Sequence, residues 1–144
     1  MKKLTRRRLN VGFESWSVFY ADVRVGGISR RSGVPNWVDQ WAWSCGFTPG
    51  CGPGETTSGT AATFDLAKIE FAQAWKRLAA IKSEDHFQEW RNFRDFTEWK
   101  YVMWDSHLPL PTQSTTGISK CFCGEAISVS QIPTHVRSVH AQSA

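Results

Sequence analysis

Large apolar residues alternate with small or polar residues in three stretches of the first third of the chain. Trp16, Val18 and Tyr20 alternate with their neighbours in the first stretch, and residues 23–29 form the second. Residues 40–47 show the clearest alternation, with one apolar face formed by Trp41, Trp43, Cys45 and Phe47. A period of two is typical of β-strands. The pattern therefore predicts a three-stranded antiparallel meander.

Two stretches with helical spacing follow. Thr63 can cap the first helix, whose apolar positions are Phe64, Ala67, Phe71, Trp75, Leu78 and Ile81. Ser83 can cap the second, whose aromatic residues recur every third position at Phe87, Trp90, Phe93, Phe96 and Trp99. Each step of three falls about 60° short of a turn, so these rings sweep roughly 240° around the helix. The second helix is expected either to lie between two packing partners or to present aromatic side chains to a binding partner.

Gly, Pro, Ser and Thr mark the segments between these elements. Residues 48–60 contain four glycines and two prolines and predict an exposed loop. Residues 107–117, with Pro109 and Pro111, predict a linker. The expected fold class is α+β, a three-stranded meander packed by two helices, with a small C-terminal module. The expected organisation is a disordered basic arm at 1–10, the α+β domain at 11–106, the linker at 107–117 and the module at 118–144.

The net charge of +4 is concentrated at one end of the chain. The first eight residues hold five basic side chains, at Lys2, Lys3, Arg6, Arg7 and Arg8. Of 17 basic residues, 12 remain against 13 acidic ones, so the rest of the chain carries about −1. The arm is expected either to attract nucleic acid or another acidic surface, or to act only as a solubilising terminus.

Arg91 and Arg94 lie among the rings of the second helix, an arrangement that can hold single-stranded nucleic acid. Because acidic residues are interleaved with them, intramolecular ion pairs such as Arg91 with Asp95 are the preferred interpretation.

No apolar run follows Arg6–Arg8 as an export signal requires, and none approaches the length of a membrane span. The sequence predicts a cytoplasmic protein with no membrane partner. Thiols stay reduced in that compartment, so the cysteines point to metal rather than to disulfides. Cys45 is expected to be a core thiol and Cys51 a loop thiol. His86 and His107 are interpreted as ordinary polar residues.

Two cysteines and two histidines cluster in the last 25 residues, at Cys121, Cys123, His135 and His140. Two thiolates and two imidazoles make the tetrahedral environment that zinc prefers. The sequence therefore predicts one Zn²⁺ site, with chance clustering as the alternative. With all four positions filled by protein and no recognisable nucleophile and base elsewhere, the chain is not expected to be an enzyme, and no small-molecule substrate is evident.

This segment resembles a C2H2 zinc finger, including apolar residues at Ile127 and Ile132, where that family keeps hydrophobic positions. It departs from the family in having a single residue between its cysteines, a spacer one residue short, and histidines five apart. Residues five apart lie about 140° apart on an ideal helix, so the last turn is expected to tighten or distort. Gly124 can adopt the left-handed conformation that a tight cysteine turn needs.

Residues 41–50, residues 59–64 and the Cys-x-Cys-Gly sequence resemble a group of small bacterial proteins, mostly alphaproteobacterial, that have no assigned activity. The meander and helix are similar to antitoxin-like and double-stranded-RNA-binding-like folds, an analogy of fold alone. The expected function is a small non-enzymatic zinc protein, regulatory or nucleic-acid-associated. The alternative is a protein-interaction adaptor in which zinc is purely structural. Since Lys120 and Arg137 are the only basic residues of the module, a zinc module of this kind would bind DNA weakly by itself.

Overall fold

The computed structural model describes residues 3–142 of the 144. Lys2, expected to contribute to a basic contact, lies outside the described residues, as do residues 1, 143 and 144. The chain divides into two compact units, Met1–Trp90 and Arg91–Ala144. This division differs from the expected one, because residues 107–117 lie inside the second unit and Pro111 is fully buried there.

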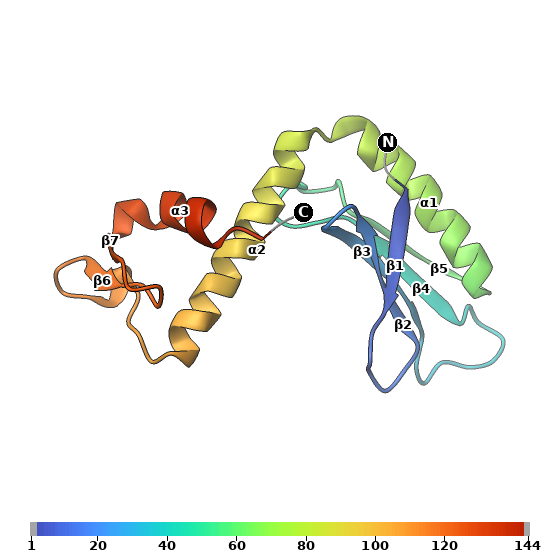
Figure 1. Cartoon of the computed structure of the whole chain (residues 1–144). Helices are drawn as coiled ribbons and strands as arrows, with labels where there is room; N and C mark the ends of the chain where they lie inside the picture. The colour runs from blue at the N-terminus through green and yellow to red at the C-terminus, as the bar shows by residue number, and fades with distance from the viewer. Residues whose placement is uncertain (1–2, 143–144) are drawn as a thin grey trace. The chain divides into compact units, whose positions relative to one another are not determined.

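The first unit contains a five-stranded antiparallel sheet rather than the three-stranded meander expected from the alternation (Figure 1). Its strands lie in sequence order: β1 (Leu4–Arg8), β2 (Ser15–Tyr20), β3 (Val23–Arg30), β4 (Trp41–Cys45) and β5 (Thr57–Ala61). The three expected strands are β2, β3 and β4, and a bulge lies between Val18 and Phe19 of β2. Both additional strands are at the edges of the sheet.

The expectation of a disordered arm is corrected for residues 4–8, which form edge strand β1. Leu4 lies opposite Tyr20 and Arg8 opposite Trp16 in the antiparallel pairing with β2. The guanidinium of Arg6 lies 5.2 Å from the ring centroid of Trp16, and that of Arg7 lies 5.5 Å from Phe19. An arginine side chain can pack over an aromatic ring in this way. Residues 4–8 can therefore pair with β2 without an apolar alternation of their own.

The expectation of an irregular loop over 48–60 is corrected at its C-terminal end, where Thr57–Ala61 forms β5. Gly59 lies opposite Trp43 in the pairing of β5 with β4. A Cβ atom added at Gly59 would lie 2.9 Å from the Trp43 ring. Gly59 weakens the sequence signal for a strand. Its missing side chain is nevertheless what leaves room for the Trp43 indole beside β5.

Helix α1 (Phe64–Ile81) lies along one face of the sheet (Figure 1). Thr63 caps it as predicted, since its side chain accepts a hydrogen bond from the N–H of Leu66 at 3.1 Å. Phe71, Trp75 and Leu78 are buried against the sheet, as the helical spacing predicted. The expected apolar face over residues 40–47 also packs here, with Cys45 of β4 and Phe47, which follows the strand, both buried. Burial raises the pKa of Cys45 to about 12, so this core thiol stays protonated.

Helix α2 (Glu84–Asp105) begins in the first unit, and its residues 91–105 belong to the second. The second unit also contains the two-stranded hairpin β6 (Ile118–Lys120) and β7 (Ala126–Ser128). Short helical turns complete it: 3₁₀ turns at Pro111–Gln113 and Val129–Gln131, α3 (Ile132–His135) and a π-helical turn at Val136–His140.

The aromatic series of α2 is divided between the two expected roles. Phe87 is buried in the core of the first unit and Trp99 in that of the second. Phe93 is 52% exposed. Two rings of α2 outside this series are also exposed, Tyr101 at 59% and Trp104 at 74%. The exposed rings therefore lie mainly toward the C-terminal end of the helix. Within residues 3–142, no helix combines the length and the apolar character that crossing a bilayer requires.

Candidate metal centre

The four predicted ligands come from three local elements of the second unit. Cys121 follows β6, and the chain then turns back through Cys123 into β7. The N–H of Gly124 bonds to the carbonyl of Cys121 at 2.8 Å, and Gly124 has the predicted left-handed conformation, with φ of 98°. His135 ends α3 and His140 ends the π-helical turn. The short cysteine turn thus faces one side of a short helical segment.

The ligand atoms of the four residues all lie within 4.8 Å of one another. Sγ of Cys121 is 3.4 Å from Nε2 of His140, and Sγ of Cys123 is 3.6 Å from Nε2 of His135. The two Nε2 atoms are 3.1 Å apart. Zinc at the centre of a regular tetrahedron would separate sulfur from nitrogen by about 3.5 Å and nitrogen from nitrogen by about 3.3 Å. The four side chains are therefore placed to hold one metal ion.

The wide histidine spacing is accommodated by the π-helical turn Val136–His140. The expectation that the last turn distorts is confirmed, but the turn widens rather than tightens. Because a π turn is closed by bonds between residues five apart, His135 and His140 come to the same side of the helix. Their ring centroids are 4.9 Å apart.

Glu125 orients one of the imidazoles. Its Oε2 lies 3.1 Å from Nδ1 of His135, whose side chain is only 5% exposed. A carboxylate at one ring nitrogen fixes the tautomer and directs the lone pair of the other nitrogen toward the ligand cluster. At the second histidine, burial and then the neighbouring His135 lower the pKa of His140, against a smaller raising effect of Glu125. A lowered pKa favours the neutral imidazole that metals bind.

Trp99 of α2 contacts the other end of the cluster. Its indole N–H donates a hydrogen bond to Sγ of Cys121 at 3.3 Å, and Trp99 is 2% exposed. The apolar side of the cluster rests on one buried core, formed by Trp99, Met103, Cys121, Ile127, Ile132 and Val136. Ile127 and Ile132, predicted as the apolar skeleton of the module, are thus buried, and their core is shared with α2.

The contacts that Trp99 and Glu125 make with the ligand residues were not predicted from the sequence. Trp99 lies 22 residues before Cys121, and the aromatic period assigned it only to packing. Glu125 lies directly after the cysteine turn, and the carboxylate partner that metal-binding histidines commonly have was the one signal that could have identified it.

The predicted basic contact residues are divided between the two units. Arg6, Arg7 and Arg8 belong to β1 of the first unit, and Lys3 directly precedes this strand. Arg91 and Arg94 are half-buried on α2, and Nε of Arg94 lies 3.1 Å from the buried Asp95 carboxylate. An intramolecular acidic partner, the interpretation preferred from the sequence, is therefore present for Arg94.

Comparison of the chain with protein-family models, with curated proteins and with solved structures found no match. The interpretation of the site therefore depends on its own geometry.

Proposed function

We propose that this protein binds one structural Zn²⁺ ion through Cys121, Cys123, His135 and His140, and that it associates with nucleic acid without acting as an enzyme. The observation that carries the zinc assignment is the convergence of two sulfur and two imidazole donors within 4.8 Å. Two thiolates with two imidazoles select zinc over harder ions. With four protein ligands, zinc would have no open position for a substrate, which is typical of structural rather than catalytic sites.

Metal content tests this assignment. Native mass spectrometry of the purified protein is expected to show one zinc per chain, and Cys123→Ser is expected to lose it. Cys51→Ser is the matched control, because Cys51 is a half-buried thiol of the first unit. A wild-type protein without transition metal, or full zinc occupancy in Cys123→Ser, contradicts the proposal.

The nucleic-acid association is supported by the charge of the sheet. The strands β1 to β5 contain five arginines, at positions 6, 7, 8, 24 and 30, and no aspartate or glutamate. Arg7, Ser17, Gly27, Ser44 and Ser58 are paired in register across the sheet. They lie on the face opposite α1, because the alternate residues Trp41 and Trp43 of β4 pack on Phe64 and Phe71 of that helix. The strand residues of this face offer Arg7, Arg24 and hydroxyl groups, which suit a phosphate backbone, and the Asp39 carboxylate is hydrogen-bonded to Thr60 in edge strand β5.

Arg24 lies across this face in a fixed position. Its Nε donates to Oγ of the buried Ser17 at 3.0 Å, and a Cβ on Gly27 would lie 3.1 Å from its Nη2. Gly27 thus leaves room for the guanidinium to lie flat on the sheet. Because the Arg24 side chain is exposed, its planar guanidinium can contact phosphate oxygens.

Salt dependence tests the association. Binding to a duplex is expected to weaken steeply with salt, because bound phosphates release their counterions. The slope of log K against log salt is expected to fall by about one for each arginine that the double variant Arg7→Gln with Arg24→Gln removes from a phosphate. The control is Lys76→Gln with Arg77→Gln, which removes the same charge from exposed positions of α1. Equal slopes for the two double variants contradict a sheet contact.

A protein-interaction adaptor is the second candidate. Phe93 and Val102 support it, since these apolar residues of α2 are 52% and 41% exposed. Binding of a protein through α2 would be largely insensitive to salt, and the arginine variants would leave it unchanged.

A further inference from the structure

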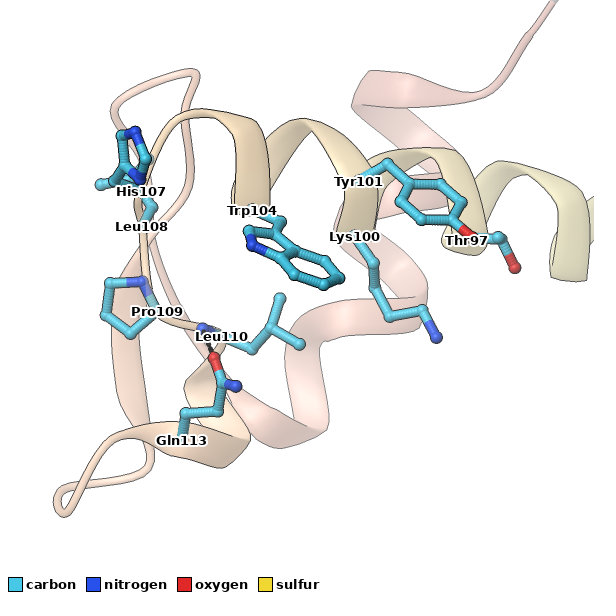
Figure 2. Close-up of a pocket in the computed structure, with 9 residues that line it drawn as sticks. All are labelled: Thr97, Lys100, Tyr101, Trp104, His107, Leu108, Pro109, Leu110 and Gln113. Atoms are coloured by element: carbon cyan, nitrogen blue, oxygen red, sulfur yellow. Dashed lines mark hydrogen bonds between the residues drawn. The ribbon is translucent and has the colours of Figure 1, made fainter.

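A pocket of about 720 Å³ lies in the second unit, where the last turns of α2 meet the segment after it (Figure 2). Tyr101 and Trp104 line it from the helix, and Pro109 and Leu110 from the returning segment. Figure 2 shows the Trp104 indole in the middle of the labelled side chains, next to Leu110. All of these residues belong to the second unit, so the pocket is formed within one compact body.

The two aromatic rings of this pocket are open to solvent. Trp104 is 74% exposed and Tyr101 59%, whereas Trp99 and Met103 on the neighbouring positions of α2 are buried. Residues three apart on a helix lie on the same side, so Tyr101 and Trp104 present their rings from one side of α2 to the pocket. Large exposed aromatic rings beside a pocket are typical of a binding surface.

The charged lining of the pocket is basic. Lys100 and His107 contribute nitrogen groups, and none of the lining residues within the described chain is acidic. Lys100 lines the pocket together with Tyr101 and Trp104, and its ammonium lies 4.8 Å from the ring centroid of the neighbouring Phe96. A planar ligand that carries negative charge matches this combination of flat apolar rings and a cation.

His107 occupies a backbone position that usually favours glycine. It lies two residues after the end of α2 with φ of 58°, and its N–H bonds to the carbonyl of Trp104 at 2.9 Å. The next N–H, of Leu108, bonds to the carbonyl of Met103 at 3.0 Å, which completes a Schellman motif. A histidine in this left-handed position is strained, and its side chain lines the pocket. Strain of this kind is consistent with a role for the side chain in binding.

We propose that this pocket binds an unpaired base of single-stranded nucleic acid. The base stacks on Trp104 and Tyr101, Lys100 contacts the adjoining phosphate, and His107 reaches the polar edge of the base. The proposal rests on the nucleic-acid association proposed above and gives it a preference for single strands. Bases of a duplex are already stacked and paired, so they cannot enter the pocket without unstacking.

The test compares binding of a fluorescent single-stranded oligothymidylate and of a duplex by the full zinc-loaded protein. Trp104→Ala is expected to weaken the single-stranded complex at least about fivefold and to leave the duplex complex unchanged. Lys100→Gln is expected to lower the salt slope of the single-stranded complex by about 0.7. Trp37→Ala is the matched control, because Trp37 is 86% exposed in the first unit. Zinc content and circular dichroism establish that the variants are folded.

Equal single-strand affinities for Trp104→Ala and Trp37→Ala would falsify the pocket assignment. It is also overturned if an acidic peptide binds in a Trp104-dependent manner while the oligothymidylate does not, which would favour the adaptor function. Absence of duplex binding, with Trp104-dependent binding of the single strand retained, contradicts the sheet contact and supports the pocket. If the wild-type protein binds neither strand form at low salt, both proposals fail.

Discussion

The indole Nε1–H of Trp99 donates a hydrogen bond to Sγ of Cys121 across 22 residues of sequence, at a distance of 3.3 Å. Both side chains are almost completely buried. This contact joins α2 to the first residue of the ligand cluster and places an N–H donor beside a sulfur that must be a thiolate to bind metal. The segment that carries the four candidate ligands therefore packs on α2 instead of standing alone behind a linker.

Replacement of Trp99 by phenylalanine is expected to weaken zinc binding about tenfold. The variant keeps an aromatic ring in the core but lacks the N–H donor to Cys121. Competition with a chromophoric zinc chelator measures the affinity. Trp104→Phe is the control, since that indole is exposed on the same helix. An unchanged affinity in Trp99→Phe would mean that the hydrogen bond does not stabilise the bound thiolate.

Glu125→Gln is expected to lower zinc affinity by roughly tenfold because the amide no longer orients and polarises His135 as the carboxylate does. The same chelator competition applies. Glu98→Gln removes one exposed carboxylate of the same unit and is expected to have little effect. If the two glutamine variants bind zinc equally, the contact between Glu125 and His135 has no role in metal binding.

Gly59→Ala is expected to destabilise the first unit by about 1–3 kcal/mol, because the added methyl group would overlap the Trp43 ring. Urea unfolding measures the change in free energy. Gly12→Ala provides the comparison, as no atom lies within 4 Å of the added Cβ. Similar stability of the two variants would show that β5 can shift away from Trp43 without cost.

His107→Gly is expected to stabilise the second unit by about 1 kcal/mol, because glycine adopts the left-handed conformation without strain, although it loses more chain entropy on folding. The same variant is expected to bind the oligothymidylate more weakly. Chemical unfolding and binding are measured on one preparation. Ser106→Gly is the control and is expected to lose stability, since Ser106 has no positive φ. A destabilised His107→Gly would contradict the assignment of strain.

Several features follow from the sequence alone because their physical causes are local. The side-chain alternation of β2, β3 and β4 and the apolar spacing of α1 reflect which positions face a core. The Thr63 cap depends on a hydrogen bond three residues away. The set of four ligand residues is recognisable because thiolate and imidazole chemistry is carried by residue type, and the cluster spans only 20 positions, from Cys121 to His140.

Other features are decided only by tertiary structure, because they depend on partners distant in sequence. Edge strands β1 and β5 have no apolar alternation of their own and form because β2 and β4 supply paired backbones and aromatic surfaces. The pairing of Trp99 with Cys121 and the division of the α2 aromatics between two cores depend on where the chain folds back. Residue types thus identified the candidate metal ligands, whereas packing determined which residues surround them.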